Sequence, residues 1–140
     1  MTSTPSALPP TRGQRRDQRR DRRRAYRLGL GAEGLAALLL RLKGWRILAR
    51  RFRSGAGEVD LIARRGEVLA FIEVKARGTR SAALEAVTAT ARGRIIRAAR
   101  IFLVQNPDQA DTVQRFDLVL VLPWRWPEHV IDAFQATHDL

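Results

Sequence analysis

Three charged residues interrupt two otherwise apolar stretches near the middle of the chain. Asp60 lies within residues 57–62 (GEVDLI), and Glu73 and Lys75 lie two positions apart within residues 70–77 (AFIEVKAR). Charged side chains in apolar strands cost free energy unless they meet water, one another or a metal ion. Two carboxylates suit Mg²⁺ or Mn²⁺, and a lysine beside them can hold or deprotonate an attacking water, or stabilise charge developing on phosphate. The pattern therefore indicates metal-assisted phosphodiester chemistry, with a hairpin whose Glu73 and Lys75 are merely solvated as the simpler alternative.

The elements that position these residues follow from hydrophobic periodicity and from breaks at glycine and proline. The sequence predicts, in order, a helix over residues 30–43 that ends at Gly44, an edge strand over 45–52, two strands over 58–64 and 68–76, a long helix over 83–105, a strand over 115–122 and a short strand around 129–134. Strands with helices before and after them indicate a mixed α/β sheet with a helix on each face. The strand over 115–122 follows a helix, so it can lie parallel to one strand of the hairpin.

The register of the predicted hairpin decides whether its charged residues meet. A tight turn at residues 65–66 places Asp60 opposite Phe71, and makes Glu73 the diagonal neighbour of Asp60 on the same face. Lys75 shares that face with Glu73 because side chains alternate along a strand. The charged groups therefore gather at the end of the hairpin away from the turn, where they can converge on one cation.

The charge balance of the chain points to an anionic partner. The sequence has 26 Lys and Arg residues against 14 Asp and Glu residues, a formal net charge of +12, and only Lys43 and Lys75 are lysines. Arginine favours bidentate contact with phosphate, and nucleic acid is the commonest polyanion. Free use of arginine by a GC-rich genome is the alternative. The absence of cysteine excludes thiolate zinc sites and cysteine nucleophiles.

The chain divides into a basic tail and one domain. Residues 1–24 have few apolar side chains to bury and are predicted to be disordered, and residues 25–137 form the predicted domain. The tail can bind nucleic acid through counterion release or act only as a solubilising extension. No apolar segment approaches the roughly 20 residues that span a membrane, so we expect a cytoplasmic protein with no membrane partner. The sequence contains no phosphate-binding glycine loop, so we expect no organic cofactor.

The segments around the charged residues resemble the YraN family of small bacterial proteins, which is similar to the PD-(D/E)xK nuclease superfamily with its restriction-endonuclease-like fold. The resemblance rests on residues 57–63 (GEVDLIA) and 71–77 (FIEVKAR), with further matches at 31–33 (GAE), 44–48 (GWRIL) and 115–117 (RFD). It covers roughly residues 27–135 and leaves the tail outside. The αβββαβ core of that superfamily agrees with the predicted order of elements.

The resemblance assigns roles to individual residues. It implies Asp60 and Glu73 as metal ligands, with the backbone carbonyl of Val74 as a candidate third ligand. Lys75 matches the catalytic lysine of the superfamily, and Glu33 matches an acid of the first helix that reaches the metal site in many members. The long helix usually carries a further polar or basic residue, for which Arg92 and Arg94 are both candidates.

Five other residues received an interpretation from the sequence. Asp117 is interpreted as structural, because an acid at the start of a strand often pairs with a neighbouring arginine. His129 and His138 have no metal-ligand spacing and are predicted to lie on the surface. Trp124 and Trp126 flank Arg125 in a turn bounded by prolines, where they can stack on bases or, as the preferred reading, pack over the end of the sheet.

The sequence thus predicts a metal-dependent, nuclease-like protein that hydrolyses phosphodiester bonds, in DNA rather than RNA. The alternative is a nucleic-acid-binding module whose nuclease site is idle, since the arginine content supports either reading. A structural or assembly protein without a nucleic-acid role is the third class.

Overall fold

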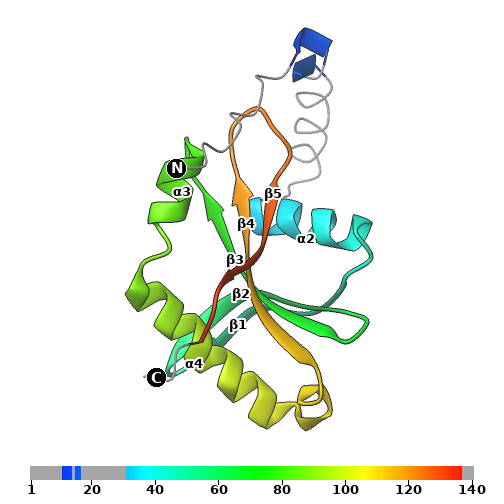
Figure 1. The fold of residues 1–140 in the computed structure, drawn as a ribbon, viewed down its shortest axis with the longest axis vertical. Helices are drawn as coiled ribbons and strands as arrows, with labels where there is room; N and C mark the ends of the chain where they lie inside the picture. Colours follow the sequence, from blue (N-terminus) through cyan, green and yellow to red (C-terminus); the bar gives the residue numbers. More distant parts are fainter. Residues whose placement is uncertain (1–10, 14, 17–30, 137–140) are drawn as a thin grey trace, which may run out of the picture.

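A computed structural model describes residues 11–13, 15–16 and 31–136 of the chain. One five-stranded sheet lies between helices on its two faces (Figure 1). The elements are α2 (Ala32–Leu42), β1 (Arg46–Ser54), β2 (Gly57–Arg65), β3 (Val68–Ala76), α3 (Arg80–Glu85), α4 (Ala89–Gln105), a short 3₁₀ turn (Pro107–Gln109), β4 (Val113–Val121) and β5 (Glu128–Phe134). This order confirms the predicted α/β class and the αβββαβ core.

The strands follow the order β1-β2-β3-β4-β5 across the sheet. All neighbours are antiparallel except β3 and β4, which run parallel and are joined through α3 and α4. The expected parallel placement of the fourth strand is confirmed, as is the edge position of the first. Among the described residues, no helix is both long and apolar enough to cross a membrane.

Each face of the sheet has its own apolar core because both faces are covered. On one face, α2 packs with inward side chains of β2, β3 and β4, which include Leu35, Leu40, Leu61, Ile72 and Val119. On the other face, α3 and α4 pack over a second group, which includes Val59, Phe71, Ile95, Phe102 and Leu120. The central strand β3 is therefore apolar on both faces, except where Glu73 and Lys75 occur near its end.

Helix α2 ends as predicted, before Gly44. Gly44 adopts a φ of 89°, and its N–H donates to the carbonyl of Arg41 at 3.0 Å. A positive φ after the last helical turn is the typical role of glycine at a helix C-terminus, because glycine has no Cβ to oppose it. The chain can then turn directly into Trp45 and β1.

The predicted long helix over residues 83–105 is wrong in its first part. The chain forms two helices there, α3 and α4, separated by residues 86–88. Thr79 and Thr88 each cap a helix N-terminus, and their hydroxyl oxygens accept hydrogen bonds from the N–H groups of Ala82 and Ala91 at 3.1 and 3.2 Å. A threonine that caps a new helix competes with continuation of the previous one.

The predicted hairpin register is also wrong, by one residue in the turn. Arg65 is the last residue of β2, and the turn consists of residues 66–67, with Gly66 at a φ of 60°. Glycine at the first central position suits a two-residue hairpin turn. Ile62 consequently pairs with Phe71, and continuing this register places Asp60 opposite Glu73 instead of diagonal to it.

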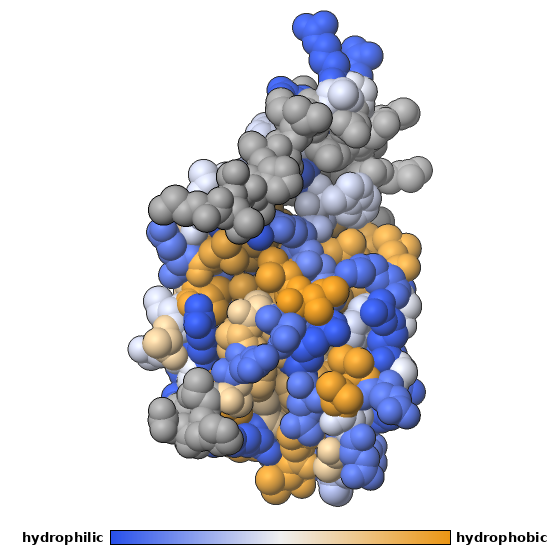
Figure 2. All heavy atoms as spheres, in the orientation of Figure 1, coloured by the Kyte–Doolittle hydropathy of each residue, from blue (hydrophilic) through white to orange (hydrophobic). Residues whose placement is uncertain are grey.

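Most of the predicted disordered tail, residues 1–24, lies outside the described residues. Within it, residues 12–13 and 15–16 have helical conformation. The domain boundary at residue 25 also falls outside the described part and stays a prediction. Figure 2 shows that hydrophilic residues lie between separate hydrophobic patches on the visible face.

Gly57 marks a close approach between β2 and α4. A Cβ atom at this position would lie 2.0 Å from the carbonyl oxygen of Arg94 and 2.7 Å from its carbonyl carbon. We expect Gly57→Ala to lower the free energy of unfolding by about 1–3 kcal/mol, because the backbones must separate to admit the methyl group. Urea denaturation measures the change. Gly55→Ala is the matched control, since a Cβ there meets nothing within 4 Å, and equal stability of the two variants would contradict the expectation.

Candidate metal-binding acid pair at the strand fork

The predicted site residues lie where two neighbouring strands part. Pairing between β2 and β3 is seen from Arg65 to Leu61, whereas β3 continues beside β4 as far as Ala76. Counted from the turn, the last pair is Leu61 with Ile72. Asp60 lies immediately before Leu61 in the sequence, and Glu73 lies immediately after Ile72. The hydrogen-bonded pairing of β2 with β3 therefore ends at the level of the two acids.

The structure brings Asp60, Glu73 and Lys75 together. The Asp60 Oδ2 atom accepts a hydrogen bond from the backbone N–H of Val74 at 2.8 Å, and a further hydrogen bond joins the carboxyl groups of Asp60 and Glu73. The Lys75 Nζ atom lies 3.0 Å from Glu73 Oε1, and the side chains of Lys75 and Glu73 are 20% and 13% exposed. The cluster is therefore mostly shielded from water while keeping an opening to it.

Burial raises the pKa of both carboxyl groups. Burial raises the pKa of Glu73 to about 7, the charge of Asp60 adds to this effect, and Lys75 opposes it. Burial also raises the pKa of Asp60, against the hydrogen bond from Val74. A cation close to two buried carboxyl groups favours the ionised form of both, so such a pair attracts one.

Glu33 lies beside this cluster and contacts a residue that the sequence did not single out. It occupies the first turn of α2, and its Oε2 atom accepts a hydrogen bond from Arg51 Nε at 2.7 Å. Its charge contributes to the raised pKa of Asp60, so the two acids are near neighbours. Arg51 has a φ of 51°, which is uncommon for a residue other than glycine and is often found near functional sites.

Arg51 escaped sequence reasoning because β1 contains several arginines with no spacing that distinguishes one of them. The two arginines that were singled out, Arg92 and Arg94, are both exposed on α4. The Arg92 guanidinium lies 5.6 Å from the ring centroid of Phe134, on β5. Arg94 contacts the start of β2 through its backbone, as described for Gly57.

The donor set at the fork fits a magnesium-like ion. Asp60 and Glu73 offer hard oxygen atoms, and Mg²⁺ commonly binds through one or two carboxylates while it keeps waters and takes phosphate oxygens. In the described part of the chain, no three His, Cys, Asp or Glu side chains form a metal-binding group. The acid pair itself would therefore hold the ion, and the roles of Glu33 and the Val74 carbonyl as ligands stay predictions.

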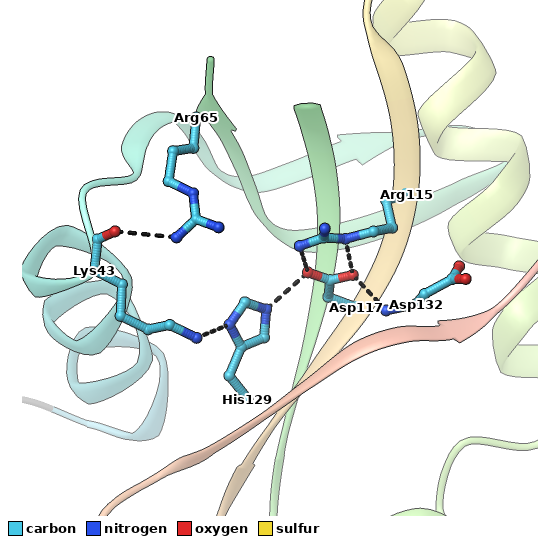
Figure 3. Close-up of polar contacts among 6 residues, drawn as sticks. All are labelled: Lys43, Arg65, Arg115, Asp117, His129 and Asp132. Atoms are coloured by element: carbon cyan, nitrogen blue, oxygen red, sulfur yellow. Dashed lines mark hydrogen bonds and ion pairs between the residues drawn. The ribbon is translucent and has the colours of Figure 1, made fainter. Parts of the chain in front are cut away.

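A second polar cluster lies near the other end of α2 and is centred on Asp117 (Figure 3). This aspartate is fully buried, and its two oxygens accept hydrogen bonds from Arg115 at 2.8 and 2.9 Å. His129 Nε2 lies 2.7 Å from Asp117 Oδ2, and Lys43 Nζ lies 2.6 Å from His129 Nδ1. The predicted pairing of Asp117 with an arginine is confirmed. The cluster joins α2, β4 and β5.

The prediction that His129 lies on the surface is wrong, because only 3% of its side chain is exposed. A lysine ammonium only donates and an ionised carboxylate only accepts. The contacts of His129 with Lys43 and with Asp117 therefore both become hydrogen bonds when the imidazole carries its proton on Nε2. No spacing in the sequence reveals this arrangement, because the partners come from three separate elements. His138 lies outside the described residues.

The Asp117 carboxylate also accepts a backbone hydrogen bond where the pairing of β4 with β5 is irregular. Their register shifts between Phe116 and Leu118, and Asp132 on the partner strand has a φ of 52°. The N–H of Asp132 donates to Asp117 Oδ1 at 2.9 Å, so a side chain replaces a ladder hydrogen bond. Burial alone would raise the pKa of Asp117, but the hydrogen bonds from His129 and Arg115 outweigh burial and hold the pKa at about 2.

Comparisons with known proteins agree with the motifs. The model of the family described as "Uncharacterised protein family UPF0102" matches residues 32–121. A UPF0102 protein of Parvibaculum lavamentivorans is 51% identical over 124 residues, 89% of this chain and 93% of its own length. UPF0102 proteins of Paramagnetospirillum magneticum and of Chelativorans are each 55% identical, over 79% and 80% of this chain and 89% and 90% of their own lengths. The chain therefore belongs to the UPF0102 family, which is the YraN family that its motifs resemble.

Proposed function

We propose that this protein is a metal-dependent nuclease that hydrolyses phosphodiester bonds in DNA. The observation that carries the proposal is the buried pair of Asp60 and Glu73, with the Glu73 pKa raised to about 7 and Lys75 3.0 Å from Glu73. Buried carboxyl groups with a raised pKa and a specific charged partner are typical of functional sites. The net charge of +12, carried almost wholly by arginine, favours a polyanionic substrate.

Each residue has a distinct task in the proposed reaction. Asp60 and Glu73 hold Mg²⁺ or Mn²⁺, which supplies Lewis-acid polarisation of a phosphoryl oxygen when it is bound. The N–H of Val74 fixes the orientation of the Asp60 carboxylate. Lys75 places a positive charge where negative charge develops on the phosphate, and in a partly shielded site such a charge acts strongly. Arg51 holds Glu33 beside the acid pair.

The test is cleavage of branched, nicked and single-stranded DNA by the purified full chain with Mn²⁺. We expect cleavage that a chelator abolishes and that Asp60→Asn reduces to the rate without metal, because the ion loses one of its two carboxylates. Glu58→Gln is the matched control, since Glu58 is an exposed acid of the same strand that pairs with Arg53 at 3.4 Å. Lack of cleavage by the wild type, or equal cleavage by Asp60→Asn, would overturn the proposal.

A second candidate function is a nucleic-acid-binding module in which the site does not cleave. The ion pair of Lys75 with Glu73 favours it, because a lysine already compensates one of the acids without any metal ion. Calorimetric titration with Mn²⁺ separates the candidates. The nuclease binds the ion and loses that binding in Glu73→Gln, whereas a pure binding module gives no heat attributable to the acid pair in either protein.

A further inference from the structure

Two tryptophans in the turn between β4 and β5 are exposed to solvent. Trp124 is 59% exposed and Trp126 is 40% exposed, whereas Trp45 is 3% exposed and lies in the core. The preferred prediction, that both rings pack over the end of the sheet, is therefore wrong. Tryptophan is on average a highly buried residue, so two exposed rings in one turn are unusual. Trp124 also has a φ of 65°, a conformation that bulky residues rarely adopt and that is often found at ligand sites.

The turn lies at the same end of the sheet as the acid pair. Strands β3 and β4 are parallel, Lys75 pairs with Leu120, and the N–H of Arg77 donates to the carbonyl of Val121 at 3.3 Å. Trp124 follows Leu120 by four residues, so at roughly 3.3 Å per residue it lies within about 13 Å of that level along the strand. Figure 1 shows the connection from β4 to β5 extending beyond the end of the sheet.

Several arginines lie close to the turn that carries the two rings. Arg125 separates them and is exposed, as is Arg77 at the end of β3. A cavity of about 800 Å³ is lined by Trp124 together with Arg12, Gly13, Arg15 and Arg16 of the tail. This volume lies within the roughly 300–1,000 Å³ of typical ligand sites. The combination of an aromatic ring and several arginines matches an unpaired nucleotide, which presents a base to stack and a phosphate to pair.

We propose that the turn over residues 123–127 binds unpaired nucleotides of single-stranded nucleic acid, with bases stacked on Trp124 and Trp126 and phosphates on the neighbouring arginines. The inference rests on the proposed nuclease function and specifies its substrate class: a nucleic acid with an unpaired segment close to the bond that is cut. A duplex conceals the faces of its bases, so it gains the contacts to phosphate alone.

The test measures binding without cleavage, with the full chain in chelator at moderate salt. We expect a labelled 12-nucleotide oligo-dT strand, followed by fluorescence anisotropy, to bind the Trp124→Ala Trp126→Ala variant at least fivefold more weakly than the wild type. Affinity for a 12-base-pair duplex should change by less than twofold. Trp124→Phe keeps a stacking ring and should keep the oligo-dT affinity within threefold, which separates stacking from damage to the turn.

Unchanged oligo-dT affinity in the double variant, or an equal loss for the duplex, would overturn the inference. If the double variant and the wild type differ in molar mass by light scattering but bind oligo-dT equally, the rings belong to a protein interface, and this result would also overturn the inference. The outcome is independent of cleavage, because binding is measured in chelator, where metal-dependent cleavage does not occur. Stacking without cleavage therefore contradicts only the proposed nuclease function, and cleavage without stacking contradicts only the inference.

Discussion

Replacing Lys75 with methionine should reduce the turnover number for DNA cleavage by about 10²–10³-fold while metal affinity stays within a few-fold of the wild type. In the proposed reaction, this loss corresponds to removal of one positioned charge that stabilises the phosphate in the transition state. Methionine preserves much of the length of the side chain and removes only the ammonium group. The charge that opposes the raised pKa of Glu73 is lost as well, so Glu73 should hold its proton more tightly in this variant.

Single-turnover cleavage with saturating Mn²⁺ and calorimetry with Mn²⁺ alone measure the two quantities. Lys43→Met is the matched control, because Lys43 is the only other lysine of the chain and contacts His129 in the second cluster. Cleavage by Lys75→Met at the wild-type rate would exclude Lys75 from the reaction. A large loss of metal binding would instead show that Lys75 shapes the acid pair and does not act on the phosphate.

Asp117→Asn should lower the free energy of unfolding by about 3–5 kcal/mol, the usual cost of breaking a buried ion pair by removing one partner. The amide keeps the size of the side chain but leaves the Arg115 charge without its counterion, and it replaces an acceptor of hydrogen bonds from Arg115 and His129 with a donor. A loss of this size is a large fraction of the total stability of a small domain. Urea denaturation at pH 7 measures it.

The pH dependence of the same measurement gives an independent check. The folded-state pKa of Asp117 is about 2, below its ordinary value of 3.8. A lowered pKa contributes stability that is fully present above the unfolded pKa and is lost as the pH falls toward 2, about 2 kcal/mol in total. Asp117→Asn should lack this part of the acid dependence, while Asp111→Asn, at an exposed position, should retain it. Equal stability of the two variants at pH 7 would show that the buried cluster contributes little.

The fold was predictable from the sequence because its strongest signals are local. The leucine stripe of α2, the glycine at its end and the alternating pattern of β3 each identify an element without knowledge of its neighbours. Asp60, Glu73 and Lys75 could be grouped for the same reason, since alternation alone places Glu73 and Lys75 on one face. The register error moved Asp60 from a position diagonal to Glu73 to one opposite it, and both positions keep the acids within reach.

The rest depended on contacts between distant parts of the chain. His129 reaches Asp117 because β5 pairs with β4 so that His129 lies opposite Val119, two residues from Asp117, and no local pattern in the sequence records that pairing. Thr88 was missed as a helix cap because the residues on either side of it are compatible with one helix. Arg51 resembles its neighbouring arginines in the sequence, and only its backbone conformation and its contact with Glu33 distinguish it.

The turn at residues 66–67 connects β2 to β3 at the end of the hairpin that is remote from the fork. Five paired positions, from Arg65 to Leu61, separate it from Asp60, a distance of roughly 17 Å at 3.4 Å per residue. Both turn residues are exposed, and a Cβ at Gly66 would meet nothing within 4 Å. The length of the hairpin separates the acids from its tip, so an affinity handle or a fluorophore attached to the side chain at position 67 lies far from Asp60 and Glu73 and leaves the backbone hydrogen bond from Val113 to Glu67 in place.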